Sequence, residues 1–357
     1  MEIEDRLAKL KNQIDAELEK FFKFKIKEVK SDNKLEELTE IIESLEKFTL
    51  NSGKRIRPIL FYFGYIIGGG ENRSEAVKTS ILVELIHSYL LIHDDIIDRD
   101  DFRHGGFSMH YSYEKKAENN FKDIDTEHFG VSMAIIAGDL SMSFGYEILN
   151  SSNFRNDLKI KALNNLDKII CNTVLGQALD LTLNKIDDFN IDSIFEMQKY
   201  KTAKYTIEGP LQLGAILAGA EEKFLNSLSG FAIPAGIAFQ IQDDIIGIFG
   251  NEKKIGKPVG SDIKEGKKTL LIVKAMEKGD NVQKQVLNNA LGSENINSDD
   301  INNIRDIIIK TKSLEFSKNK AIELVGEAKK NLNYLEVSAE DKKFLNDLAN
   351  FVVWRKY

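Results

Sequence analysis

Apolar residues recur with helical spacing along almost the whole chain, and this periodicity constrains the fold more than any other feature. In residues 36–48 the side chains of Leu38, Ile41, Ile42 and Leu45 lie three or four positions apart, which is typical of a helix with one buried face. The chain has only 4 prolines in 357 residues, so long helices can run without interruption. The sequence therefore predicts an all-α protein.

Two segments, residues 81–92 and 231–248, are apolar on nearly every side. Helices of this kind lie inside a bundle, where neighbouring helices cover several of their faces. Polar or glycine-rich stretches interrupt the helical pattern, and none has the composition of a flexible linker. These breaks fall at residues 68–72, 113–128, 250–266 and 292–300. We therefore expect residues 1–357 to form one large helical domain.

Composition excludes several classes of protein. The 49 basic and 56 acidic residues give a net charge of −7, so there is no general reason to bind nucleic acid. The one cysteine, Cys171, excludes an internal disulfide, and its apolar neighbours predict a buried, inert thiol. The longest uncharged stretch, residues 224–242, includes Asn, Ser, Pro and Gln, which favours a core helix over a membrane span. Because the first residues are charged throughout, we expect a cytoplasmic protein without stable membrane insertion.

The positions of the aspartates are the strongest indication of function. Asp94, Asp95 and Asp98 directly follow an apolar run, and Asp94 and Asp98 share a helix face because they are four residues apart. Two like charges on one face lower stability unless a cation lies between them. Mg²⁺ suits this position, because it takes carboxylate and phosphate oxygens together.

A second acidic pair, Asp243 and Asp244, interrupts another apolar helix, 149 residues after the first. A single pair of this kind is most often a helix cap or a solvated patch. Two pairs, each within an apolar helix, instead favour a metal site, since facing helices of a bundle build such sites from inward-pointing carboxylates.

Basic residues accompany both clusters. Each alone is most often a surface charge, but together they suggest a site for two polyphosphate groups, one held through metal and one by cations alone. Lys54 and Arg57 would share a face if their segment is helical. The other candidates follow the clusters or interrupt a helix: Arg103, His104, Lys201, Thr202, Lys257, Lys267 and Lys268.

In this order the motifs resemble the trans-prenyltransferases, the polyprenyl (isoprenyl) diphosphate synthases of farnesyl and geranylgeranyl type. The resemblance runs from about residue 53 to residue 269. It rests on Gly-Lys-Arg-x-Arg-Pro at 53–58, Asp-Asp-x-x-Asp at 94–98, Arg103, Gly176-Gln177 with Asp180, Lys201-Thr202, Phe-Gln-x-x-Asp-Asp at 239–244, Gly-Lys-Pro at 256–258 and Asp262. Each motif alone is weak to moderate evidence, and the ordered set is specific.

The resemblance implies a fold and an activity. The fold is a helical bundle around a deep central cavity, a single polyprenyl synthetase domain with its motifs in residues 50–270 and C-terminal helices in 270–357, in a homodimer. The activity joins isopentenyl diphosphate head-to-tail to dimethylallyl, geranyl or farnesyl diphosphate by ionisation, condensation and elimination. The product would be geranylgeranyl (C20) or farnesyl (C15) diphosphate. About three Mg²⁺ ions would serve each site, with Mn²⁺ as a substitute.

The resemblance also implies a role for each matching position. The catalytic residues would be Asp94, Asp95, Asp98, Arg103, Lys201 and Asp243, among which Asp94, Asp98 and Asp243 would hold Mg²⁺. The allylic diphosphate would be bound by Arg103, Lys201, Thr202, Gln240, Lys257 and Lys267, and isopentenyl diphosphate by Lys54, Arg57, His87 and His104. Asp95, Gln177, Asp180 and Asp244 would support these groups, and Tyr89 and Leu90 would form a floor that limits product length.

The chain departs from the family pattern at two positions. His104 replaces a second arginine, so its grip on isopentenyl diphosphate would be weaker or pH-dependent. Gly247 replaces the third aspartate of the second motif, which would remove an acid near the metals without inactivating the enzyme.

Three rival interpretations remain open. A class I terpene cyclase would need an Asn/Ser/Glu triad that residues 243–251 do not supply. A squalene or phytoene synthase would lack the Lys-Thr and Gly-Lys-Pro elements. A non-catalytic regulatory subunit of a heteromeric synthase would be expected to lose acids from one cluster, and both clusters are present.

Overall fold

The computed structural model describes residues 3–32, 36–51, 53–103, 105–184, 190–250, 259–293 and 295–354. The chain divides into two compact units, which we describe separately. The first comprises Met1–Leu163 and Leu213–Gly219, and the second comprises Asn164–Gln212 and Ala220–Tyr357. The described residues are helical apart from loops and one two-stranded hairpin, so the all-α prediction is confirmed. A single domain over residues 1–357 stays a prediction.

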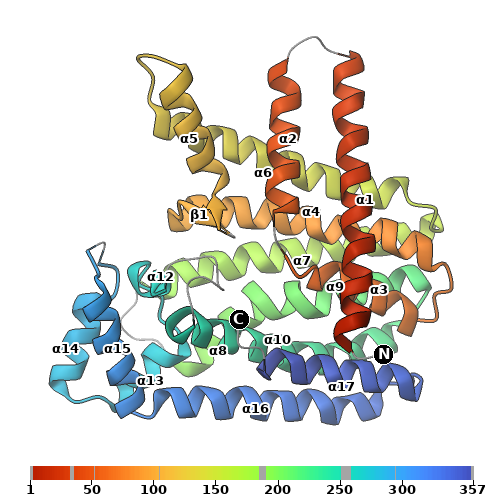
Figure 1. Ribbon diagram of the computed structural model, residues 1–357. Coiled ribbons are helices and arrows are strands. Elements are labelled where there is room, and N and C mark those ends of the chain that lie inside the picture. The colour runs from red at the N-terminus through yellow and green to blue at the C-terminus, as the bar shows by residue number, and fades with distance from the viewer. Residues whose placement is uncertain are drawn as a thin grey trace. The chain divides into compact units, whose positions relative to one another are not determined.

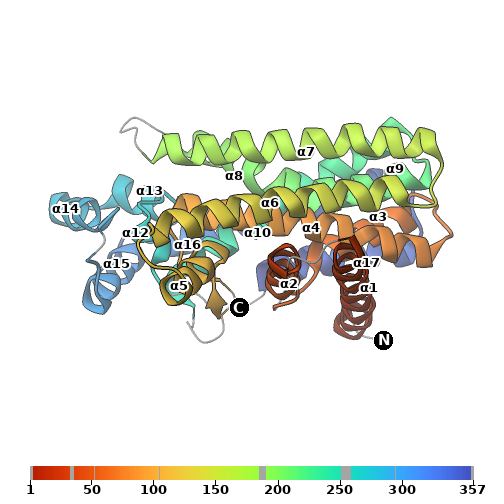
Figure 2. The same cartoon turned by 90° about the horizontal axis from the view of Figure 1, so that it is seen from above.

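The first unit is built around the apolar helix α4, which packs against α3 and α6 (Figures 1 and 2). Leu82, Leu85 and Ile86 of α4 are fully buried. Gly145 lets α6 approach closely, because a Cβ there would lie 2.9 Å from Cδ1 of Ile86. The elements are α1 (Ile3–Asp32), α2 (Glu36–Leu50), α3 (Ile56–Ile67), α4 (Arg73–Asp98), β1 (Phe102–Arg103), β2 (Gly106–Phe107), α5 (Met109–Asn120), α6 (Thr126–Ser151) and the start of α7 (Asn156–Leu183).

The break expected at residues 113–128 is shorter than predicted, because α5 continues to Asn120 and α6 begins at Thr126. The polar composition of α5 conceals one buried face, on which Tyr113 and Ala117 lie four residues apart. That narrow apolar face is enough to dock α5 on α6.

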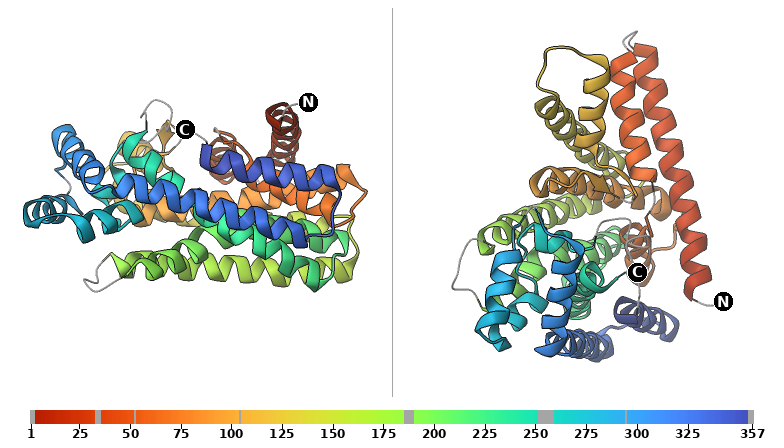
Figure 3. Two further views of the ribbon diagram at one scale, coloured as in Figure 1. Left: turned by 90° about the horizontal axis from the view of Figure 1, so that it is seen from below. Right: turned by 60° about the vertical axis from the view of Figure 1, so that its left-hand side comes forward.

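The second unit is built around α10, which packs against η1 and α16. Gly236 permits close contact with η1, because a Cβ there would lie 2.5 Å from Cα of Ala203. Figure 3 shows α17 running alongside α16. The elements after α7 are α8 (Ile191–Gln198), the π-helix η1 (Lys199–Glu208), α9 (Gly209–Ala218), α10 (Glu222–Phe249), α12 (Ser261–Lys264), α13 (Leu270–Lys278), α14 (Asn281–Ala290), α15 (Ser298–Lys310), α16 (Ser313–Asn331), η2 (Leu332–Tyr334) and α17 (Ala339–Trp354).

By length and composition, α6 and α10 could each cross a membrane. The core helix of a soluble protein passes the same test, and half of the most apolar window of α10 is buried inside the protein. Phe231, Ala235 and Ile241 of this helix are among its buried side chains. The packing agrees with the core helix expected at residues 224–242.

The prediction of a buried thiol at Cys171 is wrong, since this residue is exposed on α7. Ile169 is the buried neighbour, and a helix turns about 200° over two residues, which places Cys171 on the opposite face. The apolar run around Cys171 therefore belongs partly to an exposed face, which also carries Val174 and Leu175.

Candidate active-site residues in each unit

The first acidic cluster lies at the C-terminal end of α4. This helix has no basic residue in its last turn and ends at Arg99, which adopts a left-handed conformation with φ 56°. The C-terminus of a helix carries a partial negative charge, and Asp94, Asp95 and Asp98 add to it. The local field at this end of α4 therefore favours a cation.

Arg103 supplies a positive charge from the hairpin. Its Nε donates to Oδ1 of Asp95 at 2.6 Å, its Nη2 also contacts Asp95, and it lies 3.9 Å from Asp94. Asp95 is fully buried, and burial raises the pKa of its carboxyl to about 7 although Arg103 opposes the shift. The second oxygen of Asp95 is buried without a hydrogen-bond partner in the described structure. A cavity of about 190 Å³ next to Arg103 is also lined by Lys47, Asn51 and Ser108.

The candidate residues for isopentenyl diphosphate meet where α3 begins. Nη1 of Arg57 and Nε2 of His87 are 3.1 Å apart. Lys54 is exposed and precedes α3, which begins at Ile56, so the condition under which Lys54 and Arg57 would share a helix face is not met. The reason is the left-handed backbone of Arg55 (φ 51°), which delays the start of the helix. His104 lies outside the described residues.

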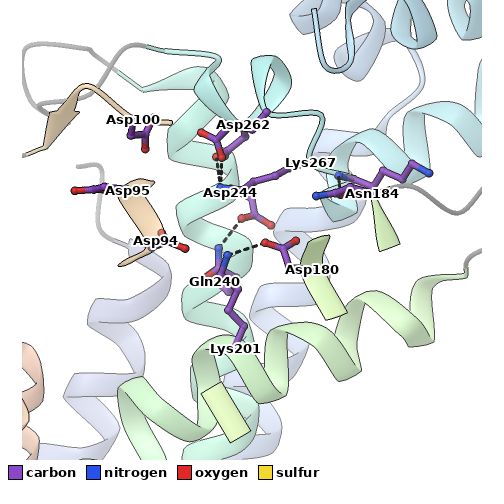
Figure 4. A network of polar contacts seen from close by, with 12 residues as sticks. Asp94, Asp95, Asp100, Asp180, Asn184, Lys201, Gln240, Asp244, Asp262 and Lys267 are labelled. Atoms are coloured by element: carbon purple, nitrogen blue, oxygen red, sulfur yellow. Dashed lines mark hydrogen bonds and ion pairs between the residues drawn. The ribbon is translucent and has the colours of Figure 1, made fainter. Parts of the chain in front are cut away.

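The second acidic cluster belongs to α10 and is held differently. Figure 4 shows Gln240 and Asp244 pointing toward one another, and Nε2 of Gln240 donates to Oδ1 of Asp244 at 2.7 Å. Nε2 of Gln198 donates to the other oxygen at 3.1 Å. Burial raises the pKa of Asp244 well above its usual value, and the neighbouring charge of Asp262 raises it further.

The π-helix η1 brings Lys201 and Thr202 to this cluster. Nζ of Lys201 donates to Asp180 at 2.6 Å, and Oγ1 of Thr202 donates to Oε1 of Gln240 at 2.7 Å. Gly176 on α7 allows the approach, because a Cβ there would lie 2.3 Å from the backbone nitrogen of Lys201. The Gly176-Gln177 motif thus serves helix packing at the position where Lys201 is held.

Lys267 contacts Glu265 and lies 3.9 Å from Asp262. The carboxylate of Asp262 lies beside Gly247, since a Cβ on Gly247 would be 2.9 Å from Oδ2 of Asp262. An acid is therefore present next to the position from which the third aspartate of the motif is missing. Lys257 lies outside the described residues.

The described residues contain no group of three or more Asp, Glu, His or Cys side chains that could hold a metal ion. Mg²⁺ is commonly held by one or two carboxylates together with phosphate oxygens and water. Asp94 and Asp98, on one face of α4, and Asp243 on α10 are half-buried carboxylates that fit this role.

Comparison with known proteins assigns the chain to a family. A family model described as polyprenyl synthetase matches residues 38–308. The geranylgeranyl diphosphate synthase of Sulfolobus acidocaldarius is 31% identical over 90% of this chain and 92% of its own. The geranylfarnesyl diphosphate synthase of Aeropyrum pernix is 31% identical over 85% of this chain and 90% of its own.

A solved structure supports the same family assignment. The geranylgeranyl pyrophosphate synthase of Corynebacterium glutamicum, complexed with isoprenyl diphosphate and magnesium, superposes with a TM-score of 0.92 at 29% identity, covering 98% of this chain and 99% of the other. The chain belongs to the polyprenyl synthetase family. It is a prenyltransferase of the short-chain isoprenyl diphosphate synthase type. The all-α isoprenoid synthase fold and the function predicted from the motifs are confirmed.

Two polar contacts of this polyprenyl synthetase were not predicted from its motifs. Gln198 binds Asp244, and the side chain of Asn184 accepts the backbone N–H of Lys268 at 3.1 Å. For Gln198 the sequence carries a signal, because its four-residue spacing from Ile194 places it on the same face of a helix. Both residues are buried in the structure. A polar residue on a buried helix face needs a partner.

Tyr89 and His93 form a contact on α4. Their ring centroids are 4.8 Å apart, and Nε2 of His93 lies 3.4 Å from the carbonyl oxygen of Ile135 on α6. Gly138 makes room for this imidazole, since a Cβ there would lie 2.5 Å from Nε2. These contacts explain His93 as a packing residue. The roles of Tyr89 and Leu90 in product length stay predictions.

Proposed function

We propose that this synthase makes geranylgeranyl (C20) diphosphate from isopentenyl diphosphate and an allylic diphosphate, in a Mg²⁺-dependent reaction. The observation that carries the proposal is the paired arrangement of acids and cations in each unit. In the first unit Asp95 binds Arg103, and in the second unit Asp180 binds Lys201. Curated relatives named geranylgeranyl diphosphate synthase support the C20 product.

Carbon–oxygen cleavage in the allylic substrate requires charge neutralisation on the departing diphosphate. Asp94, Asp98 and Asp243 would hold Mg²⁺, which supplies Lewis-acid stabilisation of that charge when bound. Arg103, Lys201 and Lys267 would contribute fixed positive charge, which acts most strongly where water is excluded. Asp95, Asp180 and Asp244 would hold these groups in place, with Gln177 supporting the packing and Thr202 fixing the Gln240 amide through its hydroxyl.

Lys54, Arg57 and His87 would bind the diphosphate of isopentenyl diphosphate without metal. The contact between Arg57 and His87 supports this assignment, because it places two side chains with N–H donors at one position. Binding both substrates together would supply proximity for carbon–carbon bond formation. The carboxylates and cations thus account for both substrates.

The direct test uses the purified full-length chain with labelled isopentenyl diphosphate and, in turn, dimethylallyl, geranyl and farnesyl diphosphate. We expect Mg²⁺-dependent incorporation that a chelator abolishes, and a C20 alcohol after dephosphorylation and chromatography. Mn²⁺ should restore part of the activity. Cyclic hydrocarbon products would indicate a cyclase. Absence of incorporation with every primer would contradict the proposal, and stimulation of another synthase subunit would then identify a regulatory role.

The length of the product tests whether Tyr89 and Leu90 form the floor that limits chain growth. Tyr89 and Leu90 are half-buried on α4, within five residues of Asp94, and removing the ring of Tyr89 should let the chain grow further. We expect Tyr89→Ala to shift the product beyond C20. The exposed Tyr334 provides a matched control, and Tyr334→Ala should leave the product unchanged. Identical product distributions for both variants would exclude the floor.

We also propose that the synthase is a homodimer. Helix α7 exposes Val174 and Leu175, the latter with 63% of its surface accessible, and α6 exposes Ile135 and Ile136. Exposed apolar faces on helices are typical of subunit interfaces. We expect Leu175→Asp to lower the mass measured by light scattering toward that of the monomer. Val282→Asp, at an equally exposed position on α14, should leave it unchanged.

A further inference from the structure

Arg55, the central cation of the Gly-Lys-Arg-x-Arg-Pro motif, is buried with 3% of its surface exposed. Its Nε donates to Oδ1 of Asp15 on α1 at 2.6 Å, and its Nη1 donates to Oε1 of Glu84 on α4 at 2.6 Å. Its neighbour Lys54 is exposed and Arg57 is half-buried. The motif therefore contains one cation committed to the protein interior between two that are accessible.

The backbone around Arg55 depends on this buried contact. Arg55 has φ 51°, a left-handed conformation that residues other than glycine rarely adopt and that persists where the surroundings impose it. Gly53 has φ 132°, and a Cβ there would lie 2.7 Å from Nη1 of Arg55. The segment of residues 53–57, which we call the cation loop, therefore folds tightly around its own guanidinium.

The same contact sets the register between the cation loop and α4. Glu84 and His87 lie three residues apart on α4 and so share a face. Arg55 binds Glu84, and Arg57 lies 3.1 Å from His87. The two contacts join the loop to α4 at successive positions, so a displaced Arg55 would displace Arg57 relative to His87.

We propose that the triad of Asp15, Arg55 and Glu84 positions the cation loop for isopentenyl diphosphate, so that helix α1 controls affinity for this substrate. The inference rests on the proposed function, in which Lys54, Arg57 and His87 bind that diphosphate. Arg55 is a positioning residue, since both of its carboxylate partners hold it inside the protein. Asp15 acts from α1, far along the chain from the sequence motifs of the family.

A purely structural role for the triad predicts a loss of stability without substrate selectivity. The chain offers a matched control for this alternative. Lys25 also lies on α1, is buried with 7% of its surface exposed, and binds Glu147 of α6 at 2.6 Å. Glu147→Gln therefore weakens a second ion pair of the same helix, between the buried Lys25 and a partly exposed carboxylate, without touching the cation loop.

The experiment compares Asp15→Asn, Glu84→Gln and Arg55→Lys with Glu147→Gln in the full-length enzyme. KM for isopentenyl diphosphate, KM for the allylic diphosphate, kcat and thermal stability are measured for each, and calorimetry measures binding of isopentenyl diphosphate without turnover. We expect Asp15→Asn and Glu84→Gln to raise KM and Kd for isopentenyl diphosphate about tenfold or more. KM for the allylic substrate should stay near that of the unchanged enzyme.

Arg55→Lys should also raise KM and Kd for isopentenyl diphosphate, because an ammonium group can satisfy one carboxylate but cannot bridge both as the guanidinium does. Glu147→Gln should lower stability and leave both KM values unchanged. The amide variants at Asp15 and Glu84 keep a hydrogen-bond acceptor for Arg55, which favours folded protein. If one variant does not fold, the other two still report on the loop.

The inference is overturned if the triad variants lose stability while binding isopentenyl diphosphate as well as the unchanged protein. It is also overturned if Glu147→Gln raises the same KM to the same extent. The proposed function fails differently, through an unchanged enzyme that does not incorporate isopentenyl diphosphate with any primer. The calorimetric Kd then tests the triad on its own.

Discussion

The buried carboxylates of α4 and of α10 are stabilised by different kinds of partner. Asp95 and Asp244 are both buried, and burial raises the pKa of each. Asp95 is neutralised by the guanidinium of Arg103, whereas the side-chain partners of Asp244 are the neutral amides of Gln240 and Gln198. The first carboxylate belongs to an ion pair inside the protein, and the second is held by hydrogen bonds.

The neighbouring charges accentuate this difference. Asp262, Asp243 and Asp180 all raise the pKa of Asp244, and Lys201 is engaged by Asp180. The carboxyl of Asp244 therefore lies among other acids and is held by neutral amides, whereas Asp95 is held by a guanidinium. We expect the α10 cluster to respond more to an added cation and the α4 cluster to depend more on Arg103.

The largest expected effect concerns the acids assigned to Mg²⁺. Asp94→Ala and Asp243→Ala should each lower kcat at least about a thousandfold, because each would remove a proposed ligand of the ion that would stabilise the departing charge. Steady-state incorporation of isopentenyl diphosphate measures both. Asp157→Ala removes an exposed acid of α7 and should leave kcat unchanged. A mild effect at one of the two positions would show that only the other cluster holds catalytic metal.

The second prediction separates the two buried carboxylates by stability. Asp95→Asn removes the carboxylate to which Nε and Nη2 of Arg103 donate, leaves Arg103 only the longer contacts with Asp94 and Asp100, and should destabilise the protein by about 3 kcal/mol. Asp244→Asn removes an acid from among acids, and Oε1 of Gln198, which is buried without a partner in the part of the chain that the structure describes, can accept the new amide N–H if the Gln198 amide rotates. We expect this variant to be neutral or stabilised by about 1 kcal/mol without Mg²⁺.

Urea unfolding with a chelator present measures both variants. Added Mg²⁺ tests whether repulsion among the acids around Asp244 is the cause. It should stabilise the unchanged protein more than it stabilises Asp244→Asn. Equal losses of stability at the two positions would contradict the distinction between an ion pair and a hydrogen-bonded acid.

The smallest expected effect is a loss of stability in mildly acidic solution. All five histidines lie between residues 87 and 128, in the first unit. Burial lowers the pKa of His110 below its usual 6.5, and Oγ of Ser108 lies 3.2 Å from its Nδ1. Because the unfolded chain binds this proton more readily, the contribution of His110 to stability is present above pH 6.5 and declines as the pH falls below it.

Stability of the unchanged protein should fall by less than about 1 kcal/mol between pH 7 and pH 6 from this group. His110→Gln should show a flatter dependence in urea unfolding over that range. An identical slope in both proteins would show that His110 does not titrate differently on folding.

The site was partly predictable from sequence because some of its geometry is local. The four-residue spacing of Asp94 and Asp98 determines a shared face in any α-helix. The shared face considered for Lys54 and Arg57 required a helical segment, and that condition is not met. Helical spacing applies only within a helix, and the left-handed Arg55 places Lys54 before the helix begins. The helical continuation of α5 through residues 113–120 was missed because only Tyr113 and Ala117 are buried in that stretch.

The sequence by itself determined the helical class, the order of the acidic and basic motifs and the family they indicate, because helical periodicity and motif spacing are properties of short segments. Only the tertiary structure decided which partner each charge takes. Arg103 binds Asp95, Gln198 binds Asp244 across 46 positions, and Arg55 turns inward to Asp15 and Glu84. These choices depend on which groups are buried together, since a buried charge or amide must find its partner among the side chains that packing brings within reach.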